Sequence, residues 1–467
     1  MERERLGSRL GFILLSAGCA IGVGNVWKFP YMTGENGGGA FVLLYLLFLF
    51  ILGLPIMVVE FALGRASQAS PIKLYQKLQK PKQKWHLHGY GALVANVLLM
   101  MFYTSVTGWI VYYFVSFLGG KMTGISETAS SNLFGNMLSD PAIMVGSMAF
   151  VVVFGFLILS FGLQKGVERV TKYMMLALLG LMITLAVYSM TLPGAATGLT
   201  FYLKPDLTKI DGNVVVGAMN QSFFTLSLGI GSMAIFGSYI GKERSLLGES
   251  INILLLDTFV AITAGLIIFP ACYTYGITPG AGPGLLFEAM ASVFNNMGAA
   301  GRWWGSLFFL FMVFAAMSTI VAVFENILAC VRELFGWGRK KACLICAVVI
   351  LALSVPCALG FNLLSEFRPF GGESSVLDLE DFIVSNCCLP LGSLCYVLFT
   401  VTKAGWGFDN FLAEANAGKG LKMGSWMRCY MTYVVPLVIL AIFVIGILNF
   451  EFGQGYTLWG QIVNLFA

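Results

Sequence analysis

Long apolar stretches dominate the chain and predict membrane-spanning helices. Eleven stretches are long enough to cross a bilayer as a helix, and short polar segments separate them. They cover approximately residues 10–34, 39–65, 88–119, 142–161, 166–191, 214–240, 249–275, 303–335, 341–359, 377–402 and 427–449. We therefore expect one all-α integral membrane domain over residues 1–467, without a separate soluble domain.

Glycines interrupt two of these stretches where an unbroken helix would be expected. The first stretch contains GCAIGVGN at residues 18–25, and the sixth contains FFTLSLGIG at residues 223–231. Glycine costs about 1 kcal/mol relative to alanine inside a helix, and in hydrocarbon each freed backbone group must find a partner within the protein. Paired interruptions at corresponding places are typical of the mid-membrane binding site of a secondary transporter.

Composition and charge agree with a multi-pass membrane protein. Hydrophobic residues make up 58% of the chain and charged residues 11%, with a mean hydropathy of +0.83, which excludes an ordinary soluble domain. The first stretch carries Asn25 and Lys28 and no evident cleavage site, so we expect no cleaved signal.

The basic residues predict the orientation in the membrane. With a cytoplasmic N-terminus, all but six of the 28 Lys and Arg residues lie in cytoplasmic segments, as the positive-inside rule requires. The six are Lys28, Lys121, Lys204, Lys209, Arg302 and Arg368. An odd number of spans then places the C-terminus outside. We expect the membrane to be the cell membrane (plasma or inner). The net charge of +5 thus reflects topology, and we expect the lipid bilayer and no nucleic acid as a partner.

No constellation of residues predicts an enzyme. The ten cysteines include a CxxC pair, Cys343 and Cys346, without other ligands nearby, and we interpret them as buried thiols. The two histidines, His86 and His88, lie in a loop. The chain lacks a Walker motif, an HExxH motif and a plausible nucleophile–base pair.

Charged residues inside the apolar stretches are the second indication of a site. They are Lys28, Glu60, Asp257, Glu325 and Asp381. Such residues are costly in a membrane unless they are paired or functional, and interhelical salt bridges are the alternative explanation. Glu60 could equally satisfy backbone N–H groups that a break frees, whereas Asp257 has no basic neighbour in the sequence, which favours a role at the site.

Oxygen atoms cluster in the same stretches. The first break offers backbone carbonyls and the Asn25 side chain, the second offers the hydroxyls of Thr225 and Ser227, and the eighth stretch offers Ser318 and Thr319. Membrane helices commonly use such hydroxyls for packing and back-bonding. Their co-occurrence with two breaks favours a site for a hard cation such as sodium.

These motifs resemble the neurotransmitter:sodium symporter family, and within it the bacterial amino-acid symporters such as the leucine transporter. The similarity runs from about residue 3 to 449 and is most specific at residues 18–31, 35–41, 165–169, 221–231 and 377–382. It implies two inverted five-helix repeats, at about 10–191 and 214–402, whose first and sixth helices unwind at the midplane. The extra helix lies at about 427–449.

The resemblance implies two sodium sites and an amino-acid site between them. The first sodium site comprises the Ala20 carbonyl, Asn25, Thr225, Asp257 and the substrate carboxylate. The second comprises the carbonyls of Gly18, Ile21 and Ala315 with the hydroxyls of Ser318 and Thr319. The substrate pocket comprises Ala20, Val23, Gly24, Leu99, Tyr103, Phe223, Phe224, Ser227, Ile230, Thr319 and Val323.

The pocket residues imply a neutral, hydrophobic amino acid, aliphatic or aromatic. Relatives that carry monoamines place an aspartate where this chain has Gly22. Because no fixed carboxylate awaits an amine here, we expect the substrate to bring its own carboxylate, which the Tyr103 hydroxyl would bind. The remaining wall is apolar, so the substrate side chain should be apolar as well.

The resemblance also implies two gates. Lys28 and Asp381 would close the outer vestibule, and Arg3 and Glu333 the inner one. Two departures from the family pattern weaken them. Relatives usually carry arginine at Lys28, so a bidentate clamp is lost, and a tryptophan frequent in the N-terminal segment is replaced by Leu6.

Together these features predict a sodium-coupled symporter that works by alternating access and does not need chloride. Relatives that need chloride carry a serine where this chain has Ala261, and an asparagine where it has Asp257, whose carboxylate would supply the negative charge. Two alternatives remain open: a proton-coupled amino-acid carrier on the same fold, and a membrane amino-acid sensor that does not transport. The oligomeric state also remains open.

Overall fold

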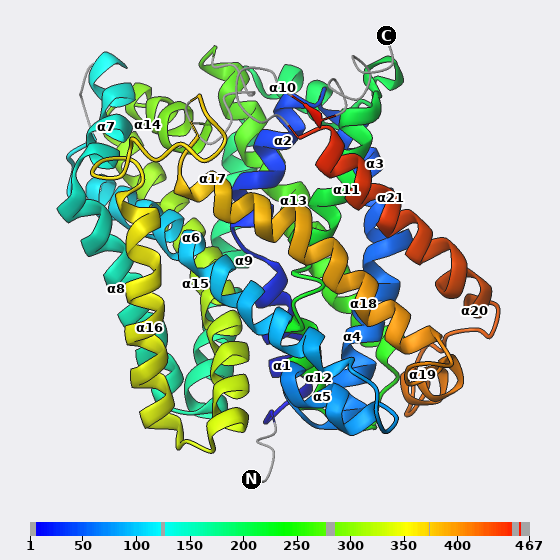
Figure 1. Ribbon diagram of the computed structural model, residues 1–467. Coiled ribbons are helices and arrows are strands. Elements are labelled where there is room, and N and C mark those ends of the chain that lie inside the picture. Colours follow the sequence, from blue (N-terminus) through cyan, green and yellow to red (C-terminus); the bar gives the residue numbers. More distant parts are fainter. Residues whose placement is uncertain (1–5, 123–126, 277–284, 373, 451–456, 459–467) are drawn as a thin grey trace.

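The computed structural model describes residues 6–122, 127–276, 285–372, 374–450 and 457–458. In this part of the chain the backbone is almost wholly helical and contains one isolated β-bridge, between Arg244 and Lys419. Long helices cross the molecule between two ends, and short helices connect them there (Figure 1). The predicted all-α class is therefore confirmed.

Most of the long helices correspond to predicted spans. They are α3–η2–α4 (Gly39–Ser67), α6 (His86–Leu118), α8 (Pro141–Ser160), η3–α9 (Leu163–Met190), α13 (Leu246–Thr274), α15 (Ala299–Phe335), α16 (Arg339–Leu359), α17–η6–α18 (Val376–Val401) and α20–η7–α21 (Met427–Leu448). Each of these nine is long and apolar enough to cross a membrane. Their ends lie within a few residues of the predicted ends.

The first and sixth predicted spans are broken, as the glycines indicate. The first consists of α1 (Arg9–Ala20), followed by η1 (Gly24–Lys28) and α2 (Phe29–Glu35), and its two halves are bent by 51°. The sixth consists of α11 (Gly212–Thr225) and α12 (Ser232–Gly237), neither of which is long enough to cross a bilayer alone. Both breaks lie in the middle of the molecule.

Shorter helices connect the spans. They are α5 (Pro71–Leu78), α7 (Glu127–Ser139), α10 (Ala195–Leu203), the 3₁₀ turn η4 (Leu207–Lys209), η5 (Leu285–Met290), α14 (Ala291–Asn296) and α19 (Phe408–Ala415). In Figure 1, α5 and α19 lie at the end where α1 begins, and α7, α10 and α14 lie at the other.

Four spans contain a π-helical turn that ends two residues before a proline. The turns are η1 (Gly24–Lys28), η2 (Leu49–Gly53), η6 (Phe382–Cys388) and η7 (Tyr430–Val434), and the prolines are Pro30, Pro55, Pro390 and Pro436. A proline ring clashes with the carbonyl four residues earlier and cannot donate to it, so the helix widens locally to an i→i−5 pattern. In η2 the freed Ile51 carbonyl accepts a hydrogen bond from the Tyr430 hydroxyl instead.

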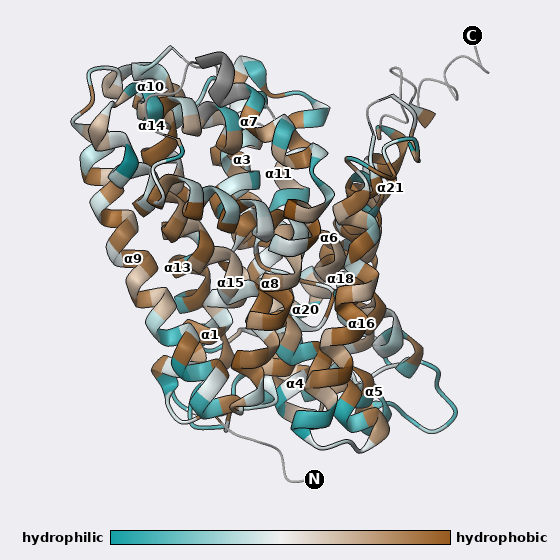
Figure 2. Cartoon of the chain, turned by 90° about the vertical axis from the view of Figure 1, so that its left-hand side faces the viewer, coloured by the Kyte–Doolittle hydropathy of each residue, from teal (hydrophilic) through white to brown (hydrophobic). Residues whose placement is uncertain are grey.

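Polarity is divided as in a membrane protein. Hydrophobic residues form a broad central belt and hydrophilic residues gather at both ends (Figure 2). Large apolar side chains face outward across this belt, among them Leu437 at 69% exposure and Val348 at 61%. So much exposed apolar surface fits lipid and does not fit water.

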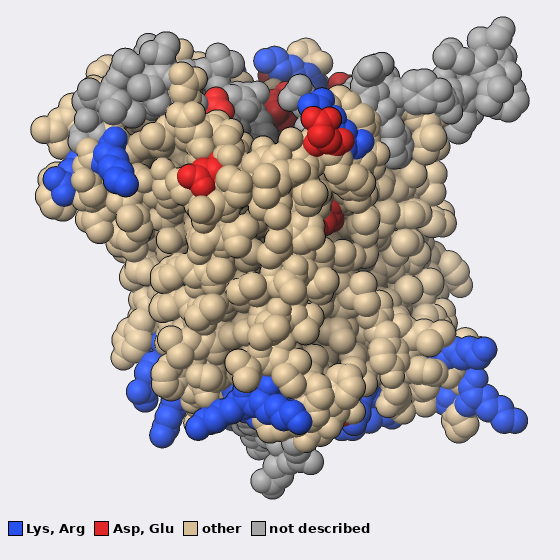
Figure 3. Space-filling model, turned by 60° about the vertical axis from the view of Figure 1, so that its left-hand side comes forward, with Lys and Arg blue, Asp and Glu red and all other residues tan. Residues whose placement is uncertain are grey.

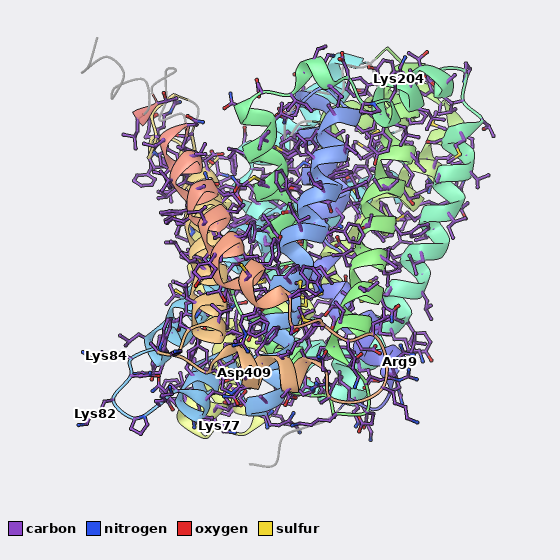
Figure 4. All side chains as sticks on the ribbon, turned by 90° about the vertical axis from the view of Figure 1, so that its right-hand side faces the viewer. Arg9, Lys77, Lys82, Lys84, Lys204 and Asp409 are labelled. Carbon is purple, nitrogen blue, oxygen red and sulfur yellow. The ribbon has the colours of Figure 1, made fainter. Side chains whose placement is uncertain are left out.

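The two ends differ in charge. In Figure 3, Lys and Arg form a row along the lower end, whereas the upper end shows both acidic and basic side chains. We call the first the basic end: it carries Arg9, Lys77, Lys82 and Lys84, and the opposite end carries Lys204 (Figure 4). This difference is the structural counterpart of the charge asymmetry in the sequence.

Candidate functional site

The first break unwinds the chain between α1 and η1. The Gly22 N–H donates to Asn25 Oδ1 at 3.1 Å, and the Gly24 carbonyl accepts from Gln221 Nε2 at 2.8 Å. A Cβ at Gly22 would lie 2.2 Å from the Tyr103 hydroxyl and 2.3 Å from Thr319 Oγ1. The break therefore brings two hydroxyl oxygens against bare backbone, where no side chain could fit.

The second break requires left-handed backbone. Ser227, Gly229 and Gly231 have φ values of 50°, 90° and 75°, a region that glycine enters without cost and serine enters with strain. Glu60 Oε1 accepts from the Gly229 N–H at 2.6 Å and Oε2 from the Met233 N–H at 3.2 Å. Of the two explanations for Glu60, the structure therefore favours satisfaction of freed backbone groups.

Two asparagines support the same break from the other side. Asn96 Nδ2 donates to the Ile230 carbonyl at 2.7 Å, and Asn326 Nδ2 donates to Asn96 Oδ1 at 3.2 Å. Both asparagines are almost fully buried. Buried amides of this kind hold an irregular segment in one conformation, because an unpaired carbonyl would cost free energy in the interior.

Asp257 of α13 lies between the two breaks. Its Oδ1 accepts from Asn25 Nδ2 at 2.8 Å, and both carboxylate oxygens lie 3.3 Å from Thr225 Oγ1. Tyr45 donates to Thr225 Oγ1 at 3.4 Å. Asp257, Asn25 and Thr225 are fully buried, and Asp257 forms no ion pair with a basic residue in the described part of the chain. We call Asn25, Thr225 and Asp257 the acidic cradle.

A second group of oxygens lies where α15 meets the first break. Thr319 Oγ1 lies 3.2 Å from the Gly18 carbonyl and 3.3 Å from the Ile21 carbonyl. Ser318 Oγ lies 3.3 Å from the Ile21 carbonyl and 2.8 Å from the Ala315 carbonyl. The structure thus brings together all five residues that the sequence predicts for a second cation site. We call Gly18, Ile21, Ala315, Ser318 and Thr319 the neutral cradle.

A cavity of about 10 Å³ lies beside the two cradles, roughly the space that one water molecule needs. Eight of the eleven predicted pocket residues line it: Ala20, Gly24, Leu99, Tyr103, Phe224, Ser227, Ile230 and Thr319. The Tyr103 hydroxyl accepts from the Val23 N–H at 2.8 Å. To admit an amino acid, the lining residues must move apart.

Three predicted residues do not line this cavity. Val23, Phe223 and Val323 are buried at 2%, 1% and 0% exposure but face other parts of the core. Successive side chains of a helix are about 100° apart, so Phe223 cannot share the direction of Phe224. Val323 lies one helical turn from Thr319, toward the basic end.

Three further residues, which the sequence did not predict for the pocket, line the same cavity: Cys19, Gly22 and Leu389. Cys19 and Gly22 lie within the glycine-rich motif at 18–25, so the motif itself was the signal. Leu389 lies in α18, and no pattern in its own stretch indicates that it reaches the pocket.

An ion pair lies beside Phe224, which lines the cavity. Lys28 Nζ lies 3.1 Å and 3.0 Å from the two carboxylate oxygens of Asp381, and 4.2 Å from the centre of the Phe224 ring. Ser385 Oγ donates to Asp381 Oδ1 at 2.6 Å and fixes the carboxylate. The predicted partners of the outer gate are therefore in contact.

The predicted inner gate is only half described. Arg3 lies outside the described residues, and Glu333 accepts from the backbone N–H and the hydroxyl of Ser70, at 3.0 Å and 2.7 Å. Two other carboxylates hold the chain around the start of α1. Glu168 accepts from the Gly7 N–H at 2.7 Å, and Glu249 from Arg9 at 2.9 Å. Neither contact was predicted, although Glu168 lies in the family motif at 165–169.

Glu325 has a structural partner. Its Oε2 lies 2.5 Å from Arg339, and its Oε1 accepts from Tyr239 at 3.0 Å. Among the acidic residues of the spans, Glu325 is thus neutralised by a salt bridge and Glu60 is surrounded by N–H donors, while Asp257 faces hydroxyl and amide groups.

Comparison with known proteins agrees with this architecture. The model of the sodium:neurotransmitter symporter family matches residues 3–126 and 133–466. The sodium-dependent transporter YhdH of Bacillus subtilis is 36% identical over 95% of this chain and 98% of its own length. The sodium-dependent serotonin transporter of Drosophila melanogaster is 26% identical over 96% of this chain and 77% of its own.

A solved structure shows the same fold. The crystal structure of MhsT in complex with L-phenylalanine superposes with a TM-score of 0.87 at 36% identity, covering 95% of this chain and all of that one. The match to the family model spans nearly the whole sequence, and the broken helices lie where its motifs predict them. The chain therefore belongs to the sodium:neurotransmitter symporter family, and it is a multi-pass, sodium-dependent membrane transporter.

Proposed function

We propose that the protein couples the entry of sodium to the uptake of neutral, hydrophobic amino acids, with two sodium sites and without chloride. The observation that carries this proposal is the acidic cradle: a fully buried carboxylate, Asp257, that faces amide and hydroxyl groups and, among the described residues, no basic side chain. Leaving a charge buried without a counter-ion is expensive, and a sodium ion would neutralise it.

The acidic cradle would hold the first sodium ion. Its ligands would be Asp257, Thr225, the Asn25 side-chain oxygen and the carbonyl of Ala20, the last residue of α1. An all-oxygen shell suits a hard monovalent cation. The substrate carboxylate would complete the shell, so that binding of ion and binding of substrate favour each other.

The neutral cradle would hold the second sodium ion. It supplies three backbone carbonyls and two hydroxyls, and each carbonyl lies 2.8–3.3 Å from at least one of the hydroxyls. Because Gly18 and Ile21 belong to α1 and the break after it, while Ser318 and Thr319 belong to α15, an ion here would join the two helices. Loss of this ion would allow α1 to move.

The cavity favours an amino acid with an apolar side chain. Tyr103 and the N-terminal end of η1 are placed to bind a carboxylate, because backbone N–H groups at a helix start attract negative charge. Gly22 leaves no room for the acidic side chain that an amine would need. Leu99, Ile230 and Phe224 supply the apolar wall, and phenylalanine is the ligand of the MhsT crystal structure.

Chloride independence follows from the charge of Asp257. Tyr45, Gln221 and Ser227 occupy the places that bind chloride in other relatives, but Tyr45 donates to Thr225 and Ser227 to the Cys19 carbonyl. Ala261, fully buried, offers no donor. The fixed carboxylate would therefore take the place of the anion.

The direction of transport follows from the basic end. We assign this end to the cytoplasm, since positive residues are retained there, which places Lys28 and Asp381 at the external gate of a cell membrane. Sodium would favour the externally open form only by its greater affinity for that form. Amino acid would then close it, and release would occur at the basic end.

Uptake into proteoliposomes tests the proposal. The purified protein should accumulate labelled leucine, methionine, phenylalanine or tryptophan when an inward sodium gradient is imposed, and charged amino acids or decarboxylated amines should not compete. Equal uptake in potassium medium without a proton gradient would overturn sodium coupling. Uptake driven by a proton gradient alone would favour the proton-coupled alternative, and binding without uptake would favour the sensor.

A further inference from the structure

One wall of the cavity comes from a helix that the sequence motifs do not connect with substrate. Leu389, the first residue of α18, lines the cavity together with residues of both breaks, α6 and α15. Its exposure is 2%. In the described part of the chain, it is the one lining residue of this cavity that α18 contributes.

Two glycines allow α18 to approach this closely. A Cβ at Gly229 would lie 2.2 Å from the Leu389 carbonyl oxygen, and a Cβ at Gly392 would lie 2.1 Å from the Gly229 carbonyl oxygen. Both distances are far below van der Waals contact, so the backbones of α18 and the second break touch directly. Helices that pack through side chains are usually 8–10 Å apart.

A π-helical turn sets the direction of Leu389. The turn η6 ends at Cys388, immediately before Leu389, and Pro390 comes next. Such a turn inserts a residue and rotates the rest of the helix about its axis, a device often found at functional sites. Because the Cα–Cβ bond of a helical residue tilts toward the helix N-terminus, the Leu389 side chain leans from the Gly229 contact toward the start of α18. Phe224 and Ser227 of the second break line the same cavity.

We propose that Leu389 is a specificity-determining residue that limits the size of the substrate side chain. This inference rests on the proposed function. Tyr103, Ser227 and Thr319 carry the hydroxyl groups of the lining. Leu389 is then left, together with Leu99, Ile230 and Phe224, to contact the apolar part of the substrate. A single methylene can change discrimination between substrates by tenfold or more, and Leu389→Ala removes several carbon atoms from this wall.

The test compares the affinities of the full-length protein for valine, leucine, phenylalanine and tryptophan in saturating sodium. For Leu389→Ala we expect the ratio of tryptophan affinity to valine affinity to rise about tenfold or more over the wild type. Leu389→Phe should shift the same ratio in the opposite direction. Leu391→Ala is the matched control, because Leu391 carries the same side chain two residues along and is 38% exposed on the outer face.

Two outcomes would overturn the inference. One is an unchanged ranking of the four amino acids in Leu389→Ala. The other is the same shift in ranking for Leu391→Ala. If Leu389→Ala does not fold, Leu389→Phe and the volume-conserving Leu389→Met decide the matter. If residue 389 is a wall of the pocket, the bulkier phenylalanine should weaken tryptophan binding selectively, and methionine should leave the ranking nearly unchanged. A wild-type protein that binds none of the four amino acids would overturn the proposed function itself, whereas wild-type binding with an insensitive residue 389 overturns only the role of Leu389.

Discussion

The acidic cradle and the neutral cradle flank the same broken helix but differ in the groups that they would offer to a cation. The acidic cradle contains the carboxyl group of Asp257, which can carry a full negative charge and accepts from Asn25 and Thr225. The neutral cradle contains carbonyl and hydroxyl dipoles. A charge interacts with an ion far more strongly than a dipole does in a dry interior. We therefore expect the acidic cradle to neutralise the charge of its ion, and the neutral cradle to join α1 to α15 through its ion.

A second contrast separates Asp257 from Glu60. Both acids are fully buried in the middle of the bundle. Glu60 accepts from two backbone N–H donors, so it stabilises the break, while Asp257 accepts from the side chains of Asn25 and Thr225, which would be sodium ligands in the proposed function. Two buried carboxylates of the same kind thus have separate roles, which substitutions can distinguish.

The largest effect should come from Asp257→Asn. An interaction with a charged group contributes about 1.5–3 kcal/mol, so removing this charge should weaken sodium affinity roughly 10–100-fold, and substrate affinity should fall with it. Sodium titrations of substrate binding measure both. Asp206→Asn, on an exposed residue, is the control. Sodium affinity within twofold of wild type in Asp257→Asn would contradict the proposal that the acidic cradle binds sodium.

Glu60→Gln should reverse this pattern. A glutamine side chain can accept from one of the two backbone N–H groups and would present its own N–H₂ to the other, at a cost of about 1–3 kcal/mol in stability. We expect a lower melting temperature of the purified protein with nearly unchanged sodium affinity. Glu243→Gln, on an exposed residue, controls for loss of charge. A melting temperature equal to wild type would contradict the backbone role of Glu60.

Thr319→Ala tests the neutral cradle. It deletes a hydroxyl near three carbonyls, and a neutral hydrogen-bonding group contributes about 0.5–1.5 kcal/mol. Sodium affinity should fall roughly 2–10-fold, less than in Asp257→Asn. Thr184→Ala, on an exposed face of α9, is the matched control. If Thr319→Ala had the larger effect of the two, the proposed difference between the cradles would be reversed.

The smallest effect on stability should come from the external gate. The side chains of Lys28 and Asp381 are 16% and 32% exposed, and such pairs contribute roughly 0–1 kcal/mol. Lys28→Ala and Asp381→Ala should therefore fold and bind substrate but transport slowly, and exchanging the two charges should restore part of the turnover. Lys204→Ala is the control. Normal transport rates in both single variants would show that the pair is not a gate.

The sequence predicts the spans well because each is a local property. Hydropathy locates eleven stretches, and the glycines at 18–25 and 223–231 mark both breaks. The π-helical turns were missed, although Pro30, Pro55, Pro390 and Pro436 mark them by a local rule: the carbonyl four residues before each proline lies inside the turn. That rule could have been applied without a structure.

Contacts between distant helices are the part that periodicity cannot supply. Leu389 reaches the cavity because Gly229 and Gly392 let two backbones touch. No pattern in the sequence around Leu389 indicates that α18 contacts the second break. Glu168 and Glu249 contact the start of α1 from positions more than 150 residues away in the sequence. Phe223 does not line the closed cavity, because a motif names neighbouring residues without the directions of their side chains. The roles of the cradle residues in binding sodium stay predictions.

One measurement tests the central claim most directly: sodium-driven uptake of phenylalanine into proteoliposomes with every chloride ion replaced by gluconate. We predict uptake equal to that in sodium chloride for the wild type, because Asp257 supplies the negative charge. Asp257→Asn should be strongly impaired, and Asp257→Asn with Ala261→Ser should regain uptake only in chloride. A wild type that stops transporting in sodium gluconate, or that transports equally well in potassium gluconate, would contradict the account.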